Sequence, residues 1–221
     1  MKSTVKIKKV ENINHNVKRF VTEKPKNYNF TSGQATHVSV NKPNWKEENR
    51  PFTFTSLNED EDLEFTIKIY PNHHGVTDQL DDLKNGDELI LEEPKGTIKY
   101  NGPGYFIAGG AGITPFISIF RDLEKKGELN HNILIFSNKT DEDIFLKEEL
   151  DDKLKHHVMY IVTNQEDTEH TKGYIDTQFL KENITDLTKH FYVCGPQKMT
   201  KAVKKSLEEI GASPNTLVFE E

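Results

Sequence analysis

The chain has 221 residues, of which 34% are hydrophobic and 29% charged, values typical of a polar-surfaced globular protein with one large or two small domains. Its formal net charge is −7, and it lacks a basic stripe interleaved with aromatic residues, which argues against nucleic-acid binding. Its one cysteine, Cys194, excludes an internal disulfide, a zinc site with several thiolates and a four-cysteine iron–sulfur cluster, so redox chemistry requires an organic cofactor or this side chain.

Residues 1–10 alternate polar and apolar side chains, unlike the apolar run of a signal peptide, and no stretch of 18 or more apolar residues predicts a membrane span. We therefore expect a cytoplasmic protein. Residues 1–50 hold 11 Lys and Arg against 4 Asp and Glu, whereas the rest of the chain is acidic. This asymmetry has two interpretations: separately solvated charges, or a positive face on the first domain that steers an acidic partner.

The first half of the chain has the pattern of β-structure. Short, partly alternating segments rich in Val, Ile, Phe and Thr predict strands at residues 4–10, 17–22, 34–40, 51–57, 63–70 and 88–91. Turn-forming residues separate these segments, and one short helix is predicted at 77–83. Short strands at this spacing predict an antiparallel β-barrel over residues 1–100.

The pattern changes after residues 101–104, a loop of turn-forming residues. Strands predicted at 105–108, 132–137, 158–163, 191–194 and 216–219 alternate with helices predicted at 114–126, 144–154, 177–181 and 197–210. This alternation predicts an α/β domain with a doubly wound parallel sheet over residues 101–221.

A glycine-rich loop follows the first of these parallel strands. Gly109, Gly110 and Gly112 stand between the strand and its helix, where backbone N–H groups can approach a pyrophosphate at a helix N-terminus. Thr114 is predicted as the N-cap of this helix and Pro115 as its first residue. An ordinary tight turn has the same composition, and Pro115 stands where the usual dinucleotide fingerprint has its third glycine.

A second motif stands at the end of a later strand, where Gly195 and Pro196 break the strand and a helix follows. Cys194 is thereby predicted at the carboxyl end of a parallel strand, the edge at which ligands bind in open sheets. A small buried hydrophobic side chain is the alternative interpretation of a lone cysteine.

A third motif, residues 50–56, lies in the predicted barrel. The planar guanidinium of Arg50 suits phosphate oxygens, and it precedes a strand in which aromatic and hydroxyl side chains alternate. Phe52 could cover a flat ring, and Thr53 could hydrogen-bond a ring nitrogen. A plain strand would show the same alternation.

The fourth motif opens the short helix at 77–83. Gly75 and Thr77 predict a second anion site at its N-terminus. The adjacent pair His73 and His74 lacks the spacing of a metal motif, so we predict turn histidines and no metal site.

In their order along the chain, these motifs resemble the ferredoxin–NADP reductase superfamily, and most closely its bacterial flavodoxin reductase and ferredoxin reductase members. The matching segments are residues 50–53, 75–77, 109–115 and 194–199, and the resemblance extends from about residue 5 to residue 219. The resemblance implies an FAD-binding barrel followed by a nicotinamide-binding domain. No arrangement of Ser, His and Asp suggests hydrolysis instead.

The resemblance also implies roles for individual residues. Arg50 would hold the FAD pyrophosphate, Phe52 would lie against the flavin, and the further FAD contacts would be Pro51, Thr53, Gly75, Val76 and Thr77. Thr53 and Cys194 would flank the point of hydride transfer, with Cys194 acting by shape and polarisability. The implied coenzyme contacts are Gly110, Gly112, Thr114, Pro115, Ser137, Lys139, Cys194, Gly195, Pro196 and Met199.

The coenzyme can be NADH or NADPH on the sequence alone. The second parallel strand of the α/β domain ends in Ser137 and Lys139, which suit a 2′-phosphate. Asn138 and Asp141, in the same segment, suit the ribose hydroxyls of NADH.

Two departures from the family pattern concern the flavin. Phe52 stands where the family usually has tyrosine, so one hydrogen bond to FAD should be lost and binding weakened. Plant-type members end in an aromatic residue that stacks on the flavin, whereas this chain ends Phe219-Glu220-Glu221, with Phe219 in a predicted strand.

The resemblance implies a reductase that passes hydride from NADH or NADPH to FAD, and electrons onward to an acidic carrier protein, flavodoxin or ferredoxin. One alternative is a reductase that uses free flavin as a substrate. The other is an electron-transfer subunit of a larger complex. The oligomeric state is left open.

Overall fold

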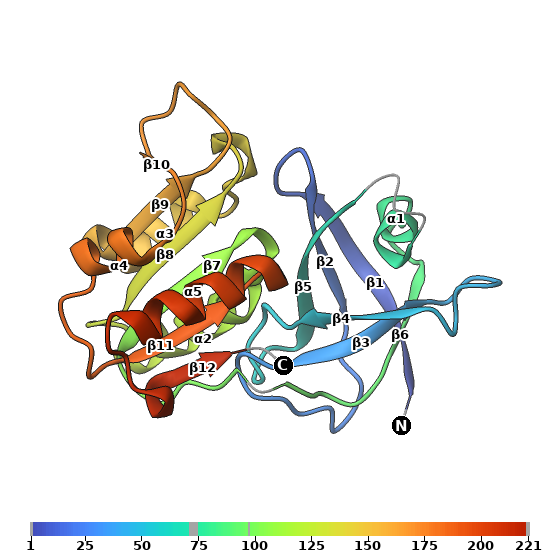
Figure 1. Ribbon diagram of the computed structural model, residues 1–221. Coiled ribbons are helices and arrows are strands. Elements are labelled where there is room, and N and C mark those ends of the chain that lie inside the picture. The colour runs from blue at the N-terminus through green and yellow to red at the C-terminus, as the bar shows by residue number, and fades with distance from the viewer. Residues whose placement is uncertain (1, 71–74, 97, 220–221) are drawn as a thin grey trace.

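The computed structural model describes residues 2–70, 75–96 and 98–219, which form two lobes lying side by side (Figure 1). The first lobe is an antiparallel barrel with one short helix, and the second is a parallel sheet with helices on both faces. The predicted fold class is confirmed. None of the helices within the described ranges is long and apolar enough to cross a membrane.

Six antiparallel strands form the barrel, in the order β4-β3-β6-β1-β2-β5. They are β1 (Ser3–Asn12), β2 (Val17–Glu23), β3 (Ala35–Val40), β4 (Asn49–Thr53), β5 (Asp62–Lys68) and β6 (Glu88–Leu91). Alternate side chains point inward, because successive residues of a strand face opposite sides, and they fill a core that includes Val5, Phe20, Phe65 and Leu89. Helix α1 (Val76–Asp81) adds buried Val76 and Leu80 to this core.

The strand predicted at 51–57 ends at Thr53, because the next residues turn the corner that closes the barrel. The Phe54 N–H still donates to the Gln34 carbonyl, whereas the Thr55 N–H donates to the Glu64 carbonyl on β5. A single bridge between Phe54 and Phe65 marks this closure. The segment therefore leaves one neighbouring strand for another, which the local alternation could not predict.

The second lobe holds six parallel strands in the order β10-β9-β8-β7-β11-β12. They are β7 (Gly104–Gly109), β8 (Ile133–Asn138), β9 (Val158–Val162), β10 (Thr171–Lys172), β11 (His190–Cys194) and β12 (Leu217–Phe219). Helices α2 (Thr114–Lys126) and α3 (Lys147–Leu154) pack on one face, and α4 (Thr177–Asn183) and α5 (Gln197–Glu209) on the other. Short 3-10 turns form at η1 (Gly110–Ile113), η2 (Asp141–Asp143), η3 (Lys155–His157) and η4 (Pro214–Thr216).

The helix predicted at 144–154 begins three residues later, at Lys147. Its N-cap, Leu146, has φ 56°, a left-handed conformation that an α-helix cannot continue through. The preceding residues form η2 instead, and the side chain of Asp143 in that turn contacts the barrel.

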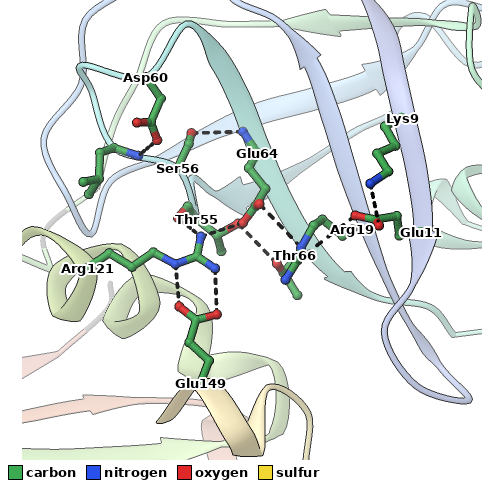
Figure 2. A network of polar contacts seen from close by, with 11 residues as sticks. Lys9, Glu11, Arg19, Thr55, Ser56, Asp60, Glu64, Thr66, Arg121 and Glu149 are labelled. Atoms are coloured by element: carbon green, nitrogen blue, oxygen red, sulfur yellow. Dashed lines mark hydrogen bonds and ion pairs between the residues drawn. The ribbon is translucent and has the colours of Figure 1, made fainter. Parts of the chain in front are cut away.

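The two lobes share a packed and hydrogen-bonded boundary centred on α2. The apolar core on the α2 face of the sheet includes Val17 and Ile98 from the barrel side. Arg121 of α2 donates two hydrogen bonds to the Glu149 carboxylate, at 2.7 and 2.8 Å, and one each to the Thr55 carbonyl and the Glu64 carboxylate, both at 2.7 Å (Figure 2). Arg121 therefore joins α2 and α3 to the segment that follows β4.

Asp143 forms a second connection between the lobes. Its Oδ1 atom accepts hydrogen bonds from Lys68 Nζ at 2.8 Å and from Asn16 Nδ2 at 3.0 Å, both of which belong to the barrel. Burial raises the pKa of Asp143, but the hydrogen bonds and charge of Lys68 outweigh it, so the pKa lies below its usual value of 3.8. The carboxylate is thus ionised where it joins the lobes.

Candidate functional site

A pocket of about 420 Å³ lies between β4 and the start of α1. The third and fourth sequence motifs meet in this pocket, although they are far apart in the chain. Its described lining is Arg50, Pro51 and Phe52 from β4, Gly75, Val76 and Thr77 at α1, and Tyr70. The structure therefore brings together six of the seven residues to which the resemblance assigns FAD contacts; His73 and His74 lie outside the described residues.

The donors of this pocket suit the diphosphate of FAD. In the part of the chain that the structure describes, the exposed Arg50 guanidinium donates only to the neighbouring Asn49 carbonyl, at 2.6 Å, which leaves further N–H groups available. Gly75 is the N-cap of helix α1 and offers no side-chain hydrogen bond to it, and Thr77 adds a hydroxyl group. The described lining contains no carboxylate, so the pocket fits an anionic group.

The side chains of β4 divide between the pocket and the barrel wall. Phe52 is half-buried and packs against the barrel core while it lines the pocket. Thr53 is only 7% exposed and does not line the pocket as described. The hydrogen bond from Thr53 to the flavin therefore stays a prediction.

Tyr70 is a pocket residue that sequence reasoning missed. Its side chain is 40% exposed, which is unusual for a large aromatic residue in this protein. Burial of the rest of the ring, and then the charge of Asp143, raise the pKa of the Tyr70 phenol, so this side chain is uncharged at neutral pH. An aromatic residue at the end of a predicted strand, just before the helix motif, was the available signal.

The two glycine-containing loops of the α/β lobe meet at the switch point of its sheet. β7 and β11 are neighbours, but α2 leads from β7 to β8 on one side and α5 leads from β11 to β12 on the other. In open sheets a ligand crevice forms where neighbouring strands connect in opposite directions. The glycine loop and Cys194 therefore lie at the edge where a dinucleotide is expected.

The glycines at this edge of the sheet differ in the physical reason why glycine occupies each position. A Cβ atom added to Gly112 would lie 2.3 Å from the Cys194 carbonyl oxygen, and one added to Gly109 would lie 2.3 Å from Met199 Sδ. Backbone packing therefore leaves no room for a side chain at Gly112, whereas the flexible Met199 side chain of α5 could move away from one at Gly109. The coenzyme contact assigned to Gly112 stays a prediction. Gly110, at φ 51°, has no heavy atom within 4 Å of an added Cβ, so its surroundings are open to a ligand.

The prediction that Thr114 caps α2 is wrong. The chain first forms the 3-10 turn η1, in which Gly110 takes a positive φ, so that Ile113 becomes the N-cap and Thr114 the first helical residue. The Thr114 hydroxyl donates back to the Ala111 carbonyl at 3.0 Å, and Pro115 follows it within the first turn. The coenzyme contacts assigned to Thr114 and Pro115 stay predictions.

Cys194 is the last residue of β11, as predicted, and its side chain is 2% exposed. It packs in the core on the α2 face of the sheet. This burial also agrees with the alternative interpretation of a small hydrophobic side chain. Contact between Cys194 and the nicotinamide therefore stays a prediction, as does the coenzyme contact assigned to Gly195.

A second pocket, of about 540 Å³, lies at the ends of β8 and β9 beside the start of α5. It brings together four residues assigned to the coenzyme, namely Ser137, Lys139, Pro196 and Met199. Sequence reasoning assigned no role to the other residues that line it, among them Thr163, Tyr174 and Lys198. They could be found only once the sheet order was known, because they come from three separate segments.

Asn138 and Asp141, which the sequence analysis associated with NADH, do not line this pocket as described. Asn138 is 5% exposed, and neither atom of its side-chain amide has a hydrogen-bond partner among the described residues. The Asp141 carboxylate accepts hydrogen bonds from Gln165 Nε2 at 2.9 Å and Thr168 Oγ1 at 2.6 Å. Asp141 therefore holds the loop after β9 in place.

Comparisons with known proteins agree with this arrangement. Residues 4–100 match the family model of an oxidoreductase FAD-binding domain, and residues 106–205 match that of an oxidoreductase NAD-binding domain. NADH–cytochrome b5 reductase 1 of Arabidopsis thaliana is 31% identical over 95% of this chain and 80% of that protein. The ferredoxin–NAD(P)+ reductase component of the Pseudomonas putida naphthalene 1,2-dioxygenase system is 25% identical over 93% of this chain and 64% of that protein.

Solved structures show the same fold. The cytochrome b5 reductase domain of Ulva prolifera nitrate reductase superposes with a TM-score of 0.85 at 22% identity, covering 99% of this chain and 97% of that one. A ferredoxin NADP+ reductase from Neisseria gonorrhoeae, solved with FAD and NADP bound, superposes with a TM-score of 0.86 at 18% identity, covering 99% and 97%.

Proposed function

Because the chain belongs to the ferredoxin–NADP reductase superfamily and is an NAD(P)H-dependent flavoprotein oxidoreductase, we propose that it serves a separate electron-carrier protein, flavodoxin or ferredoxin, in the cytoplasm. Bound FAD would supply the redox chemistry, the acceptance of hydride from the coenzyme and the delivery of single electrons to the carrier. The protein supplies binding, orientation and the exclusion of water.

One observation carries the proposal: the barrel pocket unites two distant motifs, while the glycine loop and Cys194 meet at the switch point of the neighbouring sheet. In the barrel, Arg50 and the start of α1 would hold the FAD diphosphate. Phe52 and Tyr70 would provide apolar ring surface beside it. In the α/β lobe, the open space at Gly110 would admit the coenzyme to the edge of the sheet.

We do not propose that a positive surface of the barrel steers the carrier protein to its site. Residues 1–100 together hold 15 Lys and Arg and 16 Asp and Glu, so the excess of basic residues in the first 50 is balanced within the same lobe. Lys18, for example, lies 2.7 Å from the Asp81 carboxylate, and Lys8 also pairs with Asp62. The carrier protein is supported instead by relatives whose names include cytochrome b5 reductase and a ferredoxin reductase component.

The test begins with the colour and flavin content of the purified chain. We expect a yellow protein with stoichiometric FAD whose flavin absorbance is bleached anaerobically by NADH or NADPH and restored by oxidised ferredoxin or flavodoxin. A colourless protein that reduces added flavin and releases it would support the free-flavin reductase, which the absence of a tyrosine hydroxyl at Phe52 favours. If the isolated chain oxidised neither coenzyme with ferricyanide as acceptor, the electron-transfer subunit of a larger complex would be favoured.

A pair of variants ties this activity to the barrel pocket. Arg50→Gln should lower FAD content, because the guanidinium is the charged donor of the pocket. Lys46→Gln is the matched control, since Lys46 is an exposed cation of the preceding loop that does not line the pocket as described. Equal FAD content in the two variants would contradict the assignment of Arg50.

A further inference from the structure

We propose that this protein prefers NADPH to NADH, and that Lys139 and Lys198 recognise the 2′-phosphate by which the two coenzymes differ. The inference rests on the proposed function, because it assigns the specificity of the same coenzyme site. It concerns the second pocket, into which β8, β9 and α5 each bring residues.

The two lysines reach this pocket from different elements. Lys139 follows the end of β8, and Lys198 lies in the first turn of α5. Both line the pocket of about 540 Å³, a volume that suits a small ligand. A phosphate bound between them would contact two ammonium groups, one from the segment that follows β8 and one from the helix that follows β11.

The charges of the pocket are not balanced by the protein. Its described lining contains two lysines and no Asp or Glu. Other lysines of this lobe do pair, such as Lys147 with Asp151 at 2.8 Å and Lys172 with Glu166 at 2.5 Å. Among the described residues, neither Lys139 nor Lys198 forms such an ion pair, so the positive potential there is available to an anion.

The described lining of the same pocket contains no carboxylate that could hold the ribose diol of NADH. A free ribose diol is usually held by a carboxylate near the end of the second strand of such a sheet. Asp141 is the carboxylate closest to that position in the sequence, but both of its oxygens accept hydrogen bonds from the loop after β9. The Ser137 hydroxyl, which also lines the pocket, can donate to a phosphate.

The aromatic ring of Tyr174 provides the adjoining surface. It lines the pocket and is 74% exposed, more than any other large hydrophobic side chain in the described ranges. An exposed aromatic face beside two cations suits an adenine ring whose ribose carries a phosphate. The pocket thus offers contacts for both parts of a 2′-phosphoadenosine.

Binding of adenine nucleotides tests the proposal without any turnover. Isothermal titration of the purified holoprotein should show 2′,5′-ADP binding at least about tenfold more tightly than 5′-AMP, because only the former carries the 2′-phosphate. The double variant Lys139→Gln/Lys198→Gln should lose most of this difference while 5′-AMP binding is retained. Its melting temperature, compared with that of the parent protein, checks that it is folded.

Lys201→Gln is the matched control. Lys201 is an exposed lysine of the same helix, one turn beyond Lys198, and it does not line the pocket as described. The control should leave both affinities unchanged, and the kcat/KM ratio of NADPH to NADH should fall only in the double variant. Added salt should weaken 2′,5′-ADP binding more than 5′-AMP binding.

Three results would overturn the proposal. Equal binding of 2′,5′-ADP and 5′-AMP would show that the 2′-phosphate is not recognised. If the double variant weakened the binding of 5′-ADP and 5′-AMP as much as the binding of 2′,5′-ADP, the lysines would contact the phosphates that both coenzymes share. Failure of every nucleotide to bind would remove the coenzyme from this pocket. A protein that binds 2′,5′-ADP but cannot bleach its flavin would refute the proposed function alone.

Discussion

Replacing Arg121 by methionine tests how strongly the two lobes are joined. The substitution keeps an unbranched side chain of similar length on α2 but removes all four hydrogen bonds made by the guanidinium (Figure 2). Burial lowers the pKa of Arg121, but its contacts with Glu149 and Glu64 outweigh this and raise the pKa well above the usual range. The guanidinium is therefore charged at every accessible pH.

The magnitude follows from what is left behind. The Glu64 and Glu149 side chains are 19% and 25% exposed, so without Arg121 both carboxylates lose their main partner in a largely desolvated position. Breaking a fully buried pair costs about 3–5 kcal/mol, and partial exposure reduces this, so we expect a loss of about 2–3 kcal/mol in the free energy of unfolding. For a protein of this size that corresponds to a fall of about 4–12 °C in melting temperature.

Urea and thermal unfolding measure the effect, with Lys125→Met as the control. Lys125 is one turn further along α2 and also reaches across to the barrel, at 2.5 Å from the Glu59 carboxylate, but the two side chains are 58% and 47% exposed. An exposed pair contributes about 0–1 kcal/mol, so the control should be close to the parent protein. A loss in Arg121→Met no larger than that in Lys125→Met would refute the reasoning.

Three further predictions address acid stability, the glycine loop and the flavin. Burial raises the pKa of Glu149, but the hydrogen bonds and charge of Arg121 outweigh it and hold the pKa below its usual 4.5. The Glu149 contribution to the free energy of unfolding is therefore complete above pH 4.5 and is lost as the pH falls through the folded-state pKa. A free energy of unfolding in urea that is the same at about pH 6 and about pH 3 would contradict this. Gly112→Ala should destabilise the protein by about 1–3 kcal/mol, because its Cβ would overlap the Cys194 carbonyl, and a melting temperature equal to that of the parent would argue otherwise. Phe52→Tyr should tighten FAD binding by about fivefold to tenfold through one added hydrogen bond, measured as the dissociation constant of the reconstituted apoprotein, and weaker binding would count against a flavin beside Phe52.

Local patterns predicted the elements that depend on local sequence. The helix predicted at 114–126 has the bounds observed for α2, because its apolar residues recur at helical spacing and left-handed Gly127 ends it. The strand predicted at 88–91 likewise has the bounds of β6. The two-residue strand β10 was missed, since it is defined by its pairing with β9 rather than by any alternation of its own.

For the candidate site, the sequence likewise indicated the residues that belong to local motifs and missed those that the fold brings in from elsewhere. Arg50 and Gly110 belong to motifs that stand out locally: Arg50 lines the barrel pocket and the surroundings of Gly110 are open, while their contacts with a cofactor stay predictions. Tyr70 and Tyr174 belong to no local motif, and the order of strands and helices brings them to the pockets. The packing reason for Gly112 could not be predicted either, because the atom that excludes its Cβ belongs to a residue more than 80 positions away.

Helix α2 runs from the glycine turn of the α/β lobe to the part of the barrel beside β3 and β4. It begins after the glycine turn expected to hold the coenzyme, and along its length Ser118 Oγ accepts a hydrogen bond from the Gly33 N–H at 3.0 Å and Arg121 binds the Thr55 carbonyl. Gly33 and Thr55 flank β4 and its partner strand β3, so both contacts hold the helix against the part of the barrel that carries Thr53. Two contacts along a rigid helix limit its movement relative to the barrel. Such restraint matters because hydride transfer requires reacting atoms about 3–3.5 Å apart. If the proposed function is correct, α2 therefore sets that separation, and Arg121→Met should slow flavin reduction by the coenzyme even at full FAD occupancy.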